Sequence, residues 1–363
     1  MSYRRYISAL AILFFSLGTQ NVLAVPQVPE ETGFGGFVFL GAGYTEVKSN
    51  TMAGNRFVDG GEETISSITD RPQTSEDVHP VFGGELTYTL GNRSQFFFGT
   101  SLEDLLTLDG SFQLGWRQQT QKAGIFQVGL LAAAVPTEVW EDPYQTAQTG
   151  GARDETDRDS RGARFAWDRI FGTQVEWQVT YRDIKVDKER SGQSLEGNPD
   201  PLLDCDQACQ SLLQREGDFW GTTLSYAFRQ QGRPHVFRPL VSYRTLDADG
   251  DSQSYDGWLA QLTYSYLNPK LTFITNFAYA DYSYDEANPI AIYNGQKQDS
   301  DGYIVDATVI YSLPFESRRW KLSSTVALGS IDSDIDFFNQ RLGSVSVSAF
   351  YVIGNMPSPA KKK

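Results

Sequence analysis

The chain contains few side chains that could perform acid–base chemistry, because His79 and His235 are its two histidines. A hydrolytic enzyme would need a histidine as general base, oriented by an acid and placed beside a nucleophile. His79 follows Asp77 by two residues, a pair that could act as a base, whereas His235 directly follows Pro234 in a turn-like segment. A histidine in a polar loop is usually a solvated side chain, so we expect no enzymatic activity.

Two groups of aspartates with alternate spacing could hold a cation. Calcium loops of the EF-hand kind begin with such a pattern, but their twelfth position must be a glutamate, and Trp258 stands there after the first group. An EF-hand is therefore excluded, loose binding of divalent cations stays open as an alternative, and we expect neither a metal site nor a cofactor. The two groups are Asp247, Asp249 and Asp251, and Asp332, Asp334 and Asp336.

The elements that must position these residues are best recognised in the stretch Trp258–Tyr284. Two runs of about ten residues alternate apolar with polar or small side chains, and a period of two is typical of β-strands. Only Asn268-Pro269-Lys270 separates the runs, which predicts an antiparallel hairpin. Strands of about 9–11 residues, with tight turns at one end and long polar loops at the other, are typical of membrane-spanning β-barrels.

The rest of the chain repeats this unit, which predicts an all-β fold. We expect a closed antiparallel transmembrane β-barrel of about fourteen strands (twelve to sixteen are possible), with short periplasmic turns and long external loops. The expected strands are 33–44, 81–90, 94–101, 108–117, 125–135, 163–171, 174–186, 217–229, 235–246, the two strands of the hairpin 258–284, 303–313, 320–329 and 341–353.

The first residues indicate export. Arg4 and Arg5 precede the apolar run Ile7–Gly18, and Val22-Leu23-Ala24 forms a small-residue cleavage site, which together are typical of a secretory signal peptide. The apolar run is too short to span a bilayer as a helix. We therefore expect the outer membrane of a Gram-negative bacterium as the location. The expected parts are a signal peptide over 1–24, a periplasmic lead over 25–32, the barrel over 33–353 and a periplasmic tail over 354–363.

Cys205 and Cys209 lie four residues apart in one of the long polar segments. An exported protein meets an oxidising compartment, in which a disulfide is favoured, although four residues is a tight separation for disulfide geometry. A metal site would need further ligands, so we expect a disulfide within this loop.

The composition agrees with a barrel. Aromatic residues make up 13% of the chain, and the mean hydropathy of −0.37 suits a protein with a polar lumen and polar loops. The net charge of −14 becomes −16 without residues 1–24, because that segment carries two arginines and no acid. This acidity argues against nucleic acid as a partner. We expect outer-membrane lipid, lipopolysaccharide, small hydrophilic solutes and the barrel-assembly machinery as partners, and leave monomer and trimer open.

The alternation also predicts which charged side chains point into the barrel. The arginines come from expected strands six to nine and the acids from strands two, four and twelve, so the two sets would lie on opposite walls and set up a field across a water-filled pore. The alternative is pairing across neighbouring strands, for which Asp168 and Glu176 are well placed. Side chains alone do not fill so wide a barrel, so we expect the loop Pro136–Gly162 to narrow it. The inward set is Arg164, Arg182, Arg229, Arg238, Arg244, Glu85, Asp109 and Asp306.

Four stretches carry a resemblance to a known family: GFGGFVFLGAGYTEVKSN (Gly33–Asn50), SQFFFGTSLEDLLTLDG (Ser94–Gly110), VWEDPY (Val139–Tyr144) and KVDKERSG (Lys185–Gly192). They resemble a family of Gram-negative outer-membrane β-barrel proteins known only as a domain of unknown function. The resemblance covers nearly the whole mature chain and implies an outer-membrane barrel, but no activity and no functional residue. In one departure from many such barrels, which end on phenylalanine, GNMPSPAKKK follows Ile353, so the assembly signal would be read from the region Phe350–Ile353.

These features favour a porin-like channel for passive diffusion of small hydrophilic solutes, with lumen charge and loop constriction setting selectivity. The alternative is a structural or surface-interaction protein with a plugged lumen, acting through the long loops Thr45–Pro80 and Asp187–Glu216. A transporter of hydrophobic substrates would need an apolar path. The expected inward residues are mostly Gly, Ser, Thr, Gln and charged types, which argues against that third possibility.

Overall fold

The computed structural model describes residues 27–100, 111–133, 135–230, 232–314 and 319–354. Within these ranges fourteen antiparallel strands close into a barrel, because β1 pairs with β4 on one side and with β18 on the other. This confirms the predicted fold class and strand number. The strands of the barrel are β1 (Gly33–Lys48), β4 (Ser75–Leu90), β5 (Ser94–Thr100), β6 (Ser111–Gln119), β7 (Ile125–Ala133), β9 (Glu155–Asp168), β10 (Val175–Val186), β11 (Gly217–Tyr226) continued by β12 (Phe228–Arg229), β13 (His235–Ala248), β14 (Tyr255–Leu267), β15 (Leu271–Tyr284), β16 (Ser300–Ser312), β17 (Trp320–Ser333) and β18 (Gln340–Ile353).

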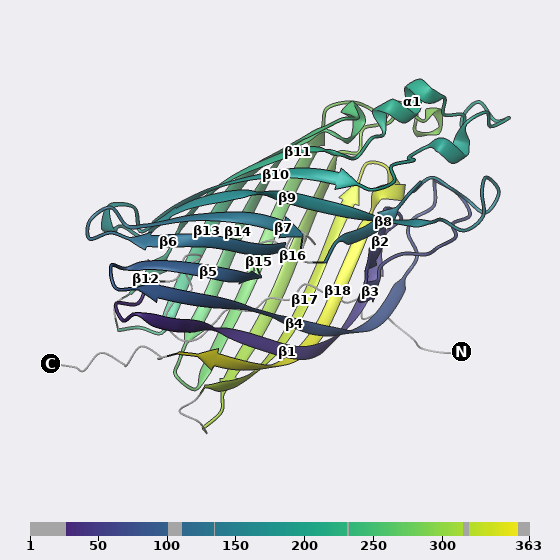
Figure 1. Cartoon of the computed structure of the whole chain (residues 1–363). Helices are drawn as coiled ribbons and strands as arrows, with labels where there is room; N and C mark the ends of the chain where they lie inside the picture. Colours follow the sequence, from purple (N-terminus) through teal and green to yellow (C-terminus); the bar gives the residue numbers. More distant parts are fainter. Residues whose placement is uncertain (1–26, 101–110, 134, 231, 315–318, 355–363) are drawn as a thin grey trace.

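Further elements lie beyond the external ends of these strands (Figure 1). Among the described residues no helix is long and apolar enough to cross a membrane. The short strands β2, β3 and β8 pair with one another and with β9 at the external end. They are β2 (Met52–Asn55), β3 (Val58–Asp59) and β8 (Thr137–Trp140), and the helical pieces at this end are α1 (Gln207–Leu212) and the 3-10 turns Gln193–Leu195, Asp251–Gln253, Ala291–Tyr293 and Asp336–Phe338. A further 3-10 turn, Ile170–Gly172, lies at the opposite end, between β9 and β10.

Strand β10 shows how the period of two sorts side chains between the two faces of the wall. Glu176, Gln178 and Thr180 are buried on the lumen side, whereas Trp177 on the outer face is exposed. Successive side chains of a strand point to opposite faces, so an outward apolar set forms the band that lipid would cover. The outer face of the other strands repeats this pattern, with exposed Phe82, Leu86, Leu114, Leu224, Leu262, Phe277, Val305, Val326 and Val347.

One region of the inner wall, on β1, β4 and β18, is more apolar than the sequence predicts. Phe37, Phe39 and Phe350 are buried together with Val81 on the inner side of β1, β4 and β18. Their rings are 5.1–6.4 Å apart, a spacing at which aromatic rings attract one another. The inner wall therefore combines a phenylalanine cluster with a polar remainder.

Several strands extend further outward than predicted. The expected loop Thr45–Pro80 is shorter, because β1 continues to Lys48 and β4 begins at Ser75. Pro80 is tolerated inside β4, since β5 pairs with β4 only at Glu85–Leu90, and a proline can occupy a strand position whose N–H has no ladder partner. The prediction of a loop over Pro136–Gly162 is likewise wrong, because this segment contains β8 and the first half of β9.

The turn between β9 and β10 also differs from the prediction. The strand expected over 163–171 ends at Asp168, and a 3-10 turn follows instead of a two-residue turn at Gly172-Thr173. Arg169 and Phe171 have positive φ angles of 53° and 51°, which strand residues do not adopt. The Trp167 indole Nε1 donates to the Ala123 carbonyl at 2.7 Å, which fixes this turn against the neighbouring one.

The predicted signal peptide and Asp109 lie outside the described residues, as do the predicted tail beyond Gly354 and the first residues of the lead.

Close packing of β1 on β4 depends on glycine at position 36. Gly36 has a φ of +121°, and a Cβ there would lie 1.9 Å from the Glu85 carbonyl oxygen. We predict that Gly36→Ala lowers the free energy of unfolding by about 2–4 kcal/mol, from overpacking and backbone strain together. Denaturant unfolding of the refolded protein in micelles, followed by tryptophan fluorescence, measures this. Gly221→Ala, whose Cβ would meet the Phe219 ring at an ordinary 3.4 Å, should change little; equal losses in both variants would contradict the explanation.

Candidate functional site: the lumen and its external cap

Five external loops pack into one apolar cluster, which we call the cap. It consists of residues 60–74, 141–154, 187–216, 285–299 and 334–339, which connect β3 to β4, β8 to β9, β10 to β11, β15 to β16 and β17 to β18. Each loop contributes buried side chains to a shared core. A loop with its own buried core is fixed in place rather than solvated. The core residues are Ile65, Ile68, Tyr144, Leu195, Cys205, Leu213, Ile290, Tyr293, Ile335 and Phe337.

Contacts within the cap cross the mouth of the barrel. The Tyr293 hydroxyl donates to the Ile68 carbonyl at 2.7 Å, and the Asn288 amide donates to the Tyr144 hydroxyl at 3.3 Å. Tyr293 and Asn288 follow β15, whereas Ile68 and Tyr144 precede β4 and β9, which lie on the far side of the strand order. Loops from opposite walls therefore meet over the external opening. Burial raises the pKa of the Tyr144 and Tyr293 hydroxyls, as expected of phenols inside an apolar core.

Arg153 joins three segments of the external end. Its guanidinium donates to the Asn50 carbonyl at 2.6 Å and to the Pro143 carbonyl at 3.2 Å, and it also donates to the Glu62 carbonyl. The group lies 4.3 Å above the ring of Trp140, within the range of a cation–π interaction. Burial lowers the pKa of Arg153 to about 10, so the side chain is still charged at neutral pH. Its Nη1 and Nη2 atoms donate to backbone carbonyls, whereas Nε is buried without a hydrogen-bond partner in the described part of the chain.

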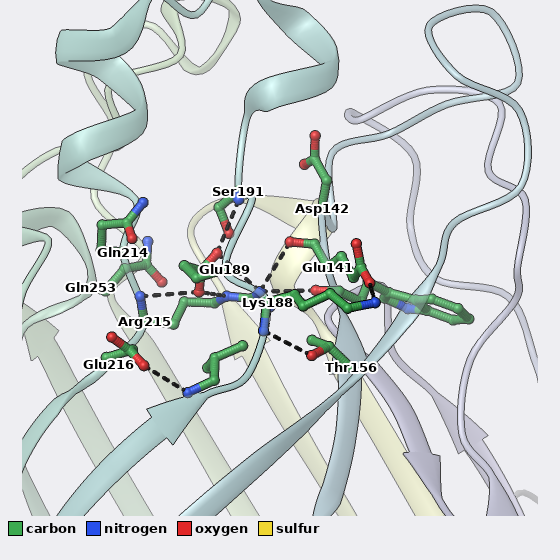
Figure 2. A network of polar contacts seen from close by, with 12 residues as sticks. Glu141, Asp142, Thr156, Lys188, Glu189, Ser191, Gln214, Arg215, Glu216 and Gln253 are labelled. Carbon is green, nitrogen blue, oxygen red and sulfur yellow. Dashed lines mark hydrogen bonds and ion pairs between the residues drawn. The ribbon is translucent and has the colours of Figure 1, made fainter.

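A second polar cluster connects β8 to the loop after β10, and we call it the latch: Glu141, Lys188, Glu189, Arg190 and Arg215. Figure 2 shows Glu141, Lys188, Glu189 and Arg215 of this cluster. Arg215 Nε lies 2.7 Å from Glu189 Oε2, and its Nη2 donates to the Trp140 carbonyl at 2.8 Å. Glu141 pairs with Lys188 at 2.7 Å and with Arg190 at 3.1 Å. The stretches VWEDPY and KVDKERSG, which carry the family resemblance, thus bind each other here.

Inside the barrel, Arg117 is the centre of a hydrogen-bonded group. Its guanidinium contacts Glu85 at 2.5 and 2.9 Å, Gln127 at 2.6 Å and Gln95 at 3.3 Å, and it lies 4.0 Å over the ring of Phe97. Arg117 is only 3% exposed. Removing one partner of a buried ion pair leaves an uncompensated charge at a cost of about 3–5 kcal/mol. Glu85, expected in the lumen, is thus neutralised by an arginine two strands away.

The expected inward arginines also have partners in the wall. Arg182 donates to Ser160 Oγ at 2.9 Å and to Ser111 Oγ at 3.2 Å, and Arg164 donates to Thr180 Oγ1 at 3.0 Å. Arg238 lies 3.1 Å from Glu176. The sequence leaves open that Glu176 pairs across neighbouring strands, and this contact instead reaches from β10 to β13 across the intervening β11.

The other residues expected in the lumen differ from one another in burial and in hydrogen-bond partners. Asp306 is buried and accepts from the Asn276 amide at 3.0 Å. Arg244 donates to the Tyr282 hydroxyl at 3.3 Å. Arg229 lies at the turn end of β12 and is exposed, so its place is the rim of the barrel and not its middle.

Lumen exposure is uneven around the wall. The inward side chains of β6, β7, β9 and β10 are almost all buried, whereas those of β11, β13 and β14 keep partial exposure. Arg244 pairs in register with Gly221 and Gly257, and the ring of Tyr282 packs over Gly257 while that of Phe219 lies beside Gly221. We call this side the strip and define it as Thr223, Arg244, Leu259 and Gln261.

The structure separates the two residues considered for acid–base chemistry. His79 faces inward and binds Thr45 Oγ1 at 2.7 Å and the Pro80 carbonyl at 3.2 Å. The Asp77 carboxylate instead accepts from the backbone of Val78 at 2.6 Å and of Asp59 at 3.3 Å. The pairing of His79 with Asp77 that the sequence allows is therefore not formed, because the two side chains bind different partners.

Cys205 and Cys209 form a disulfide beside the cap core. Among the described residues no group of three or more His, Cys, Asp or Glu side chains is placed to hold a metal ion. Asp336, from the second aspartate group, pairs with Arg71 at 2.8 Å. This arginine lowers the pKa of the Asp336 carboxyl.

The family model "Protein of unknown function (DUF2860)" matches residues 33–352, from the start of β1 to the penultimate residue of β18. The chain belongs to this family. The match covers the whole barrel with its cap, and it confirms the predicted family resemblance. No curated protein matches the chain.

Several solved structures resemble the DUF2860 chain. One is the outer membrane channel DcaP of Acinetobacter baumannii, with 12% identity, a TM-score of 0.41, and coverage of 89% of this chain and 97% of that one. Another is a mutant of the TodX monoaromatic hydrocarbon channel, with 10% identity, a TM-score of 0.48 and coverage of 90% and 91%. A third is an anion-selective porin from Comamonas acidovorans, with 10% identity, a TM-score of 0.39 and coverage of 89% and 100%.

The position of Arg153 predicts a specific effect on the cap. We expect Arg153→Met, which keeps much of the apolar stem, to leave three backbone carbonyls without this donor, at about 1–3 kcal/mol for each one that is buried. Hydrogen exchange of the backbone should accelerate in residues 60–74 and 141–154, with the barrel strands unchanged. Arg56→Met, an exposed arginine between β2 and β3, serves as the control. Unchanged exchange in the cap of Arg153→Met would show that these hydrogen bonds do not hold the loops together.

Proposed function

We propose that the protein is an outer-membrane channel for small hydrophilic solutes, and that the cap closes its external mouth in the state described here. The strip carries the proposal: Thr223, Arg244 and Gln261 present polar groups on an inner wall that keeps partial exposure. A barrel of fourteen strands is wider than the eight-stranded kind that side chains fill. A solute would pass along this wall rather than through the packed side next to β7 and β9.

Lumen charge supports a preference for anions. Glu85 and Glu176 each have an arginine as partner. Arg244, which belongs to the strip, has the neutral hydroxyl of Tyr282 as its partner. Charged side chains that line a pore set the sign of the ions that pass. The strip is therefore proposed to be electropositive, in place of the field between opposite walls that the sequence suggests.

In this proposal the cap, and not a loop folded into the barrel, narrows the pore. The segment 136–162, expected to fold into the pore, instead contributes β8, part of β9 and one of the five cap loops. Because loops from opposite walls share one core, the cap would open through loss of several contacts together, with the latch as the element between β8 and the loop after β10.

The proposed setting is the outer membrane, with lipid around the apolar band and lipopolysaccharide around the external ends of the strands. Export by a cleaved signal peptide over 1–24 and insertion by the barrel-assembly machinery belong to the same proposal.

A surface-interaction protein is the second candidate, and the cap favours it. The cap presents a fixed external surface from five loops, which could bind a partner without any solute crossing the barrel.

Breaking the latch should open the channel. We predict that Arg215→Ala raises the open probability in planar bilayers at least about tenfold, corresponding to about 1.4 kcal/mol, because Glu189 loses its buried partner. Arg233→Ala, in the exposed turn before β13, should behave like the unmodified protein. Correct insertion without conductance in all three proteins would refute the channel and favour the surface-interaction alternative.

Removing the cation of the strip should change selectivity. We predict that Arg244→Ala, measured as the reversal potential in a salt gradient with the latch broken, shifts the preference from anions toward cations. Arg341→Ala, which removes an exposed arginine at the external end of β18, is matched in charge and should leave the reversal potential unchanged. An equal shift in both variants would place the selectivity outside the strip.

A further inference from the structure

The external surface of the cap contains a cavity that shares Glu141 and Arg190 with the latch but has no ligand in the roles above. It is a half-open hollow where the loop after β8 meets the loop after β10, with a volume of about 200 Å³. The residues that line it are Glu141, Asp142, Gln145, Thr149, Asp154, Arg190, Gln193 and Ser194. All eight are polar, which distinguishes the cavity from the apolar core beneath it.

The floor of the cavity is rigid and its charges are balanced. Asp142 accepts from the backbone N–H groups of Gly192 at 2.9 Å and Ser194 at 2.8 Å. Glu141 is paired with Lys188 and Arg190, and it lies beside Asp142 at the end of β8 in Figure 2. Both acids are at most 5% exposed. These two carboxylates therefore fix the shape of the cavity, and most of their hydrogen bonds and ion pairs are made within the protein.

The remaining groups around the cavity offer both donors and acceptors. Ser194 Oγ is buried and has no hydrogen-bond partner in the described part of the chain. Asp154 and Gln193 are exposed at the rim, and Arg190 uses only Nη1 to bind Glu141. A buried hydroxyl without a partner is rare in proteins, so a polar group from outside would improve the hydrogen bonding at this position.

The cavity is lined by acidic, basic and neutral polar groups together, and this combination favours a neutral polar ligand. An anion would meet the carboxylates of Glu141, Asp142 and Asp154, whereas a metal ion would meet Arg190 and the nearby Lys188. A neutral hydroxyl donates one hydrogen bond and accepts others, so neighbouring hydroxyls can satisfy acids, amides and a guanidinium together. The volume is below the roughly 300–1,000 Å³ of drug-sized pockets, which suits one small polar ring.

We infer that this cavity binds a single sugar residue. The sugar is a free monosaccharide or a unit of a surface polysaccharide such as lipopolysaccharide, since both present the same hydroxyl chemistry. Bound there, it would bridge two cap loops and stabilise the cap, because a ligand that binds only the folded form shifts the equilibrium toward it. This inference does not depend on conductance.

Calorimetric titration of the refolded full chain tests the inference. The micelles are made of lauryldimethylamine oxide, which carries no sugar, and the probes are glucose, galactose and the oligosaccharide released from lipopolysaccharide by mild acid. We expect saturable binding of at least one probe. Asp154→Ala and Gln193→Ala should each weaken it by about fivefold or more, as expected for the loss of one hydrogen bond in the protein.

The control is Gln207→Ala, which lies on α1 of the same loop and is exposed outside the cavity. It should leave the dissociation constant unchanged. Binding of the monosaccharides assigns the site to soluble sugars, and binding of the oligosaccharide alone assigns it to the cell surface. The inference is overturned if no probe binds saturably, or if Asp154→Ala and Gln193→Ala bind as tightly as the Gln207→Ala control.

Discussion

The pairing of β1 with β18 is the contact on which the rest of the structure depends. It closes the ring from Gly36–Ile353 to Lys48–Arg341, and so removes the two free edges that an open sheet would expose to lipid. In a bilayer every backbone N–H and C=O must find a partner within the protein. Once the ring is closed, the period of two decides which side chain meets lipid and which meets the lumen.

Beyond the lipid the same strands serve a second purpose. The external parts of β1, β4 and β9 extend past the apolar band and support the cap, which has an apolar core and buried polar contacts of its own. Arg153 and Arg215 hold neighbouring loops through backbone carbonyls. In the proposed function this cap closes one end of a barrel whose inner wall is partly polar. The sugar-sized cavity lies on the outside of this cap, where a ligand would strengthen the closed state.

The alternation predicts the transmembrane strands well, because lipid imposes an apolar face on every second residue. It fails for the external parts of β4 and β9, where both faces meet water or the cap and residues such as Ser75–Asp77 or Glu155–Arg158 carry no apolar period. The inward direction of Arg182 follows from the alternation of side chains along its strand alone. Its partner Ser111, and the pairing of Glu85 with Arg117, depend on which strands lie close together in the closed wall. The cap joins residues as far apart as Ile68 and Tyr293, and no local pattern encodes such contacts.

Side-specific labelling of a single cysteine tests most directly whether the cap closes a polar lumen. Thr223 lies on the strip, and both native cysteines are in a disulfide, so Thr223→Cys would be the single free thiol. In oriented liposomes, a charged thiol reagent should label it from the periplasmic side and not from the external side, and external labelling should appear once the latch is broken by Arg215→Ala. Rapid labelling from the external side with the latch intact would contradict the account.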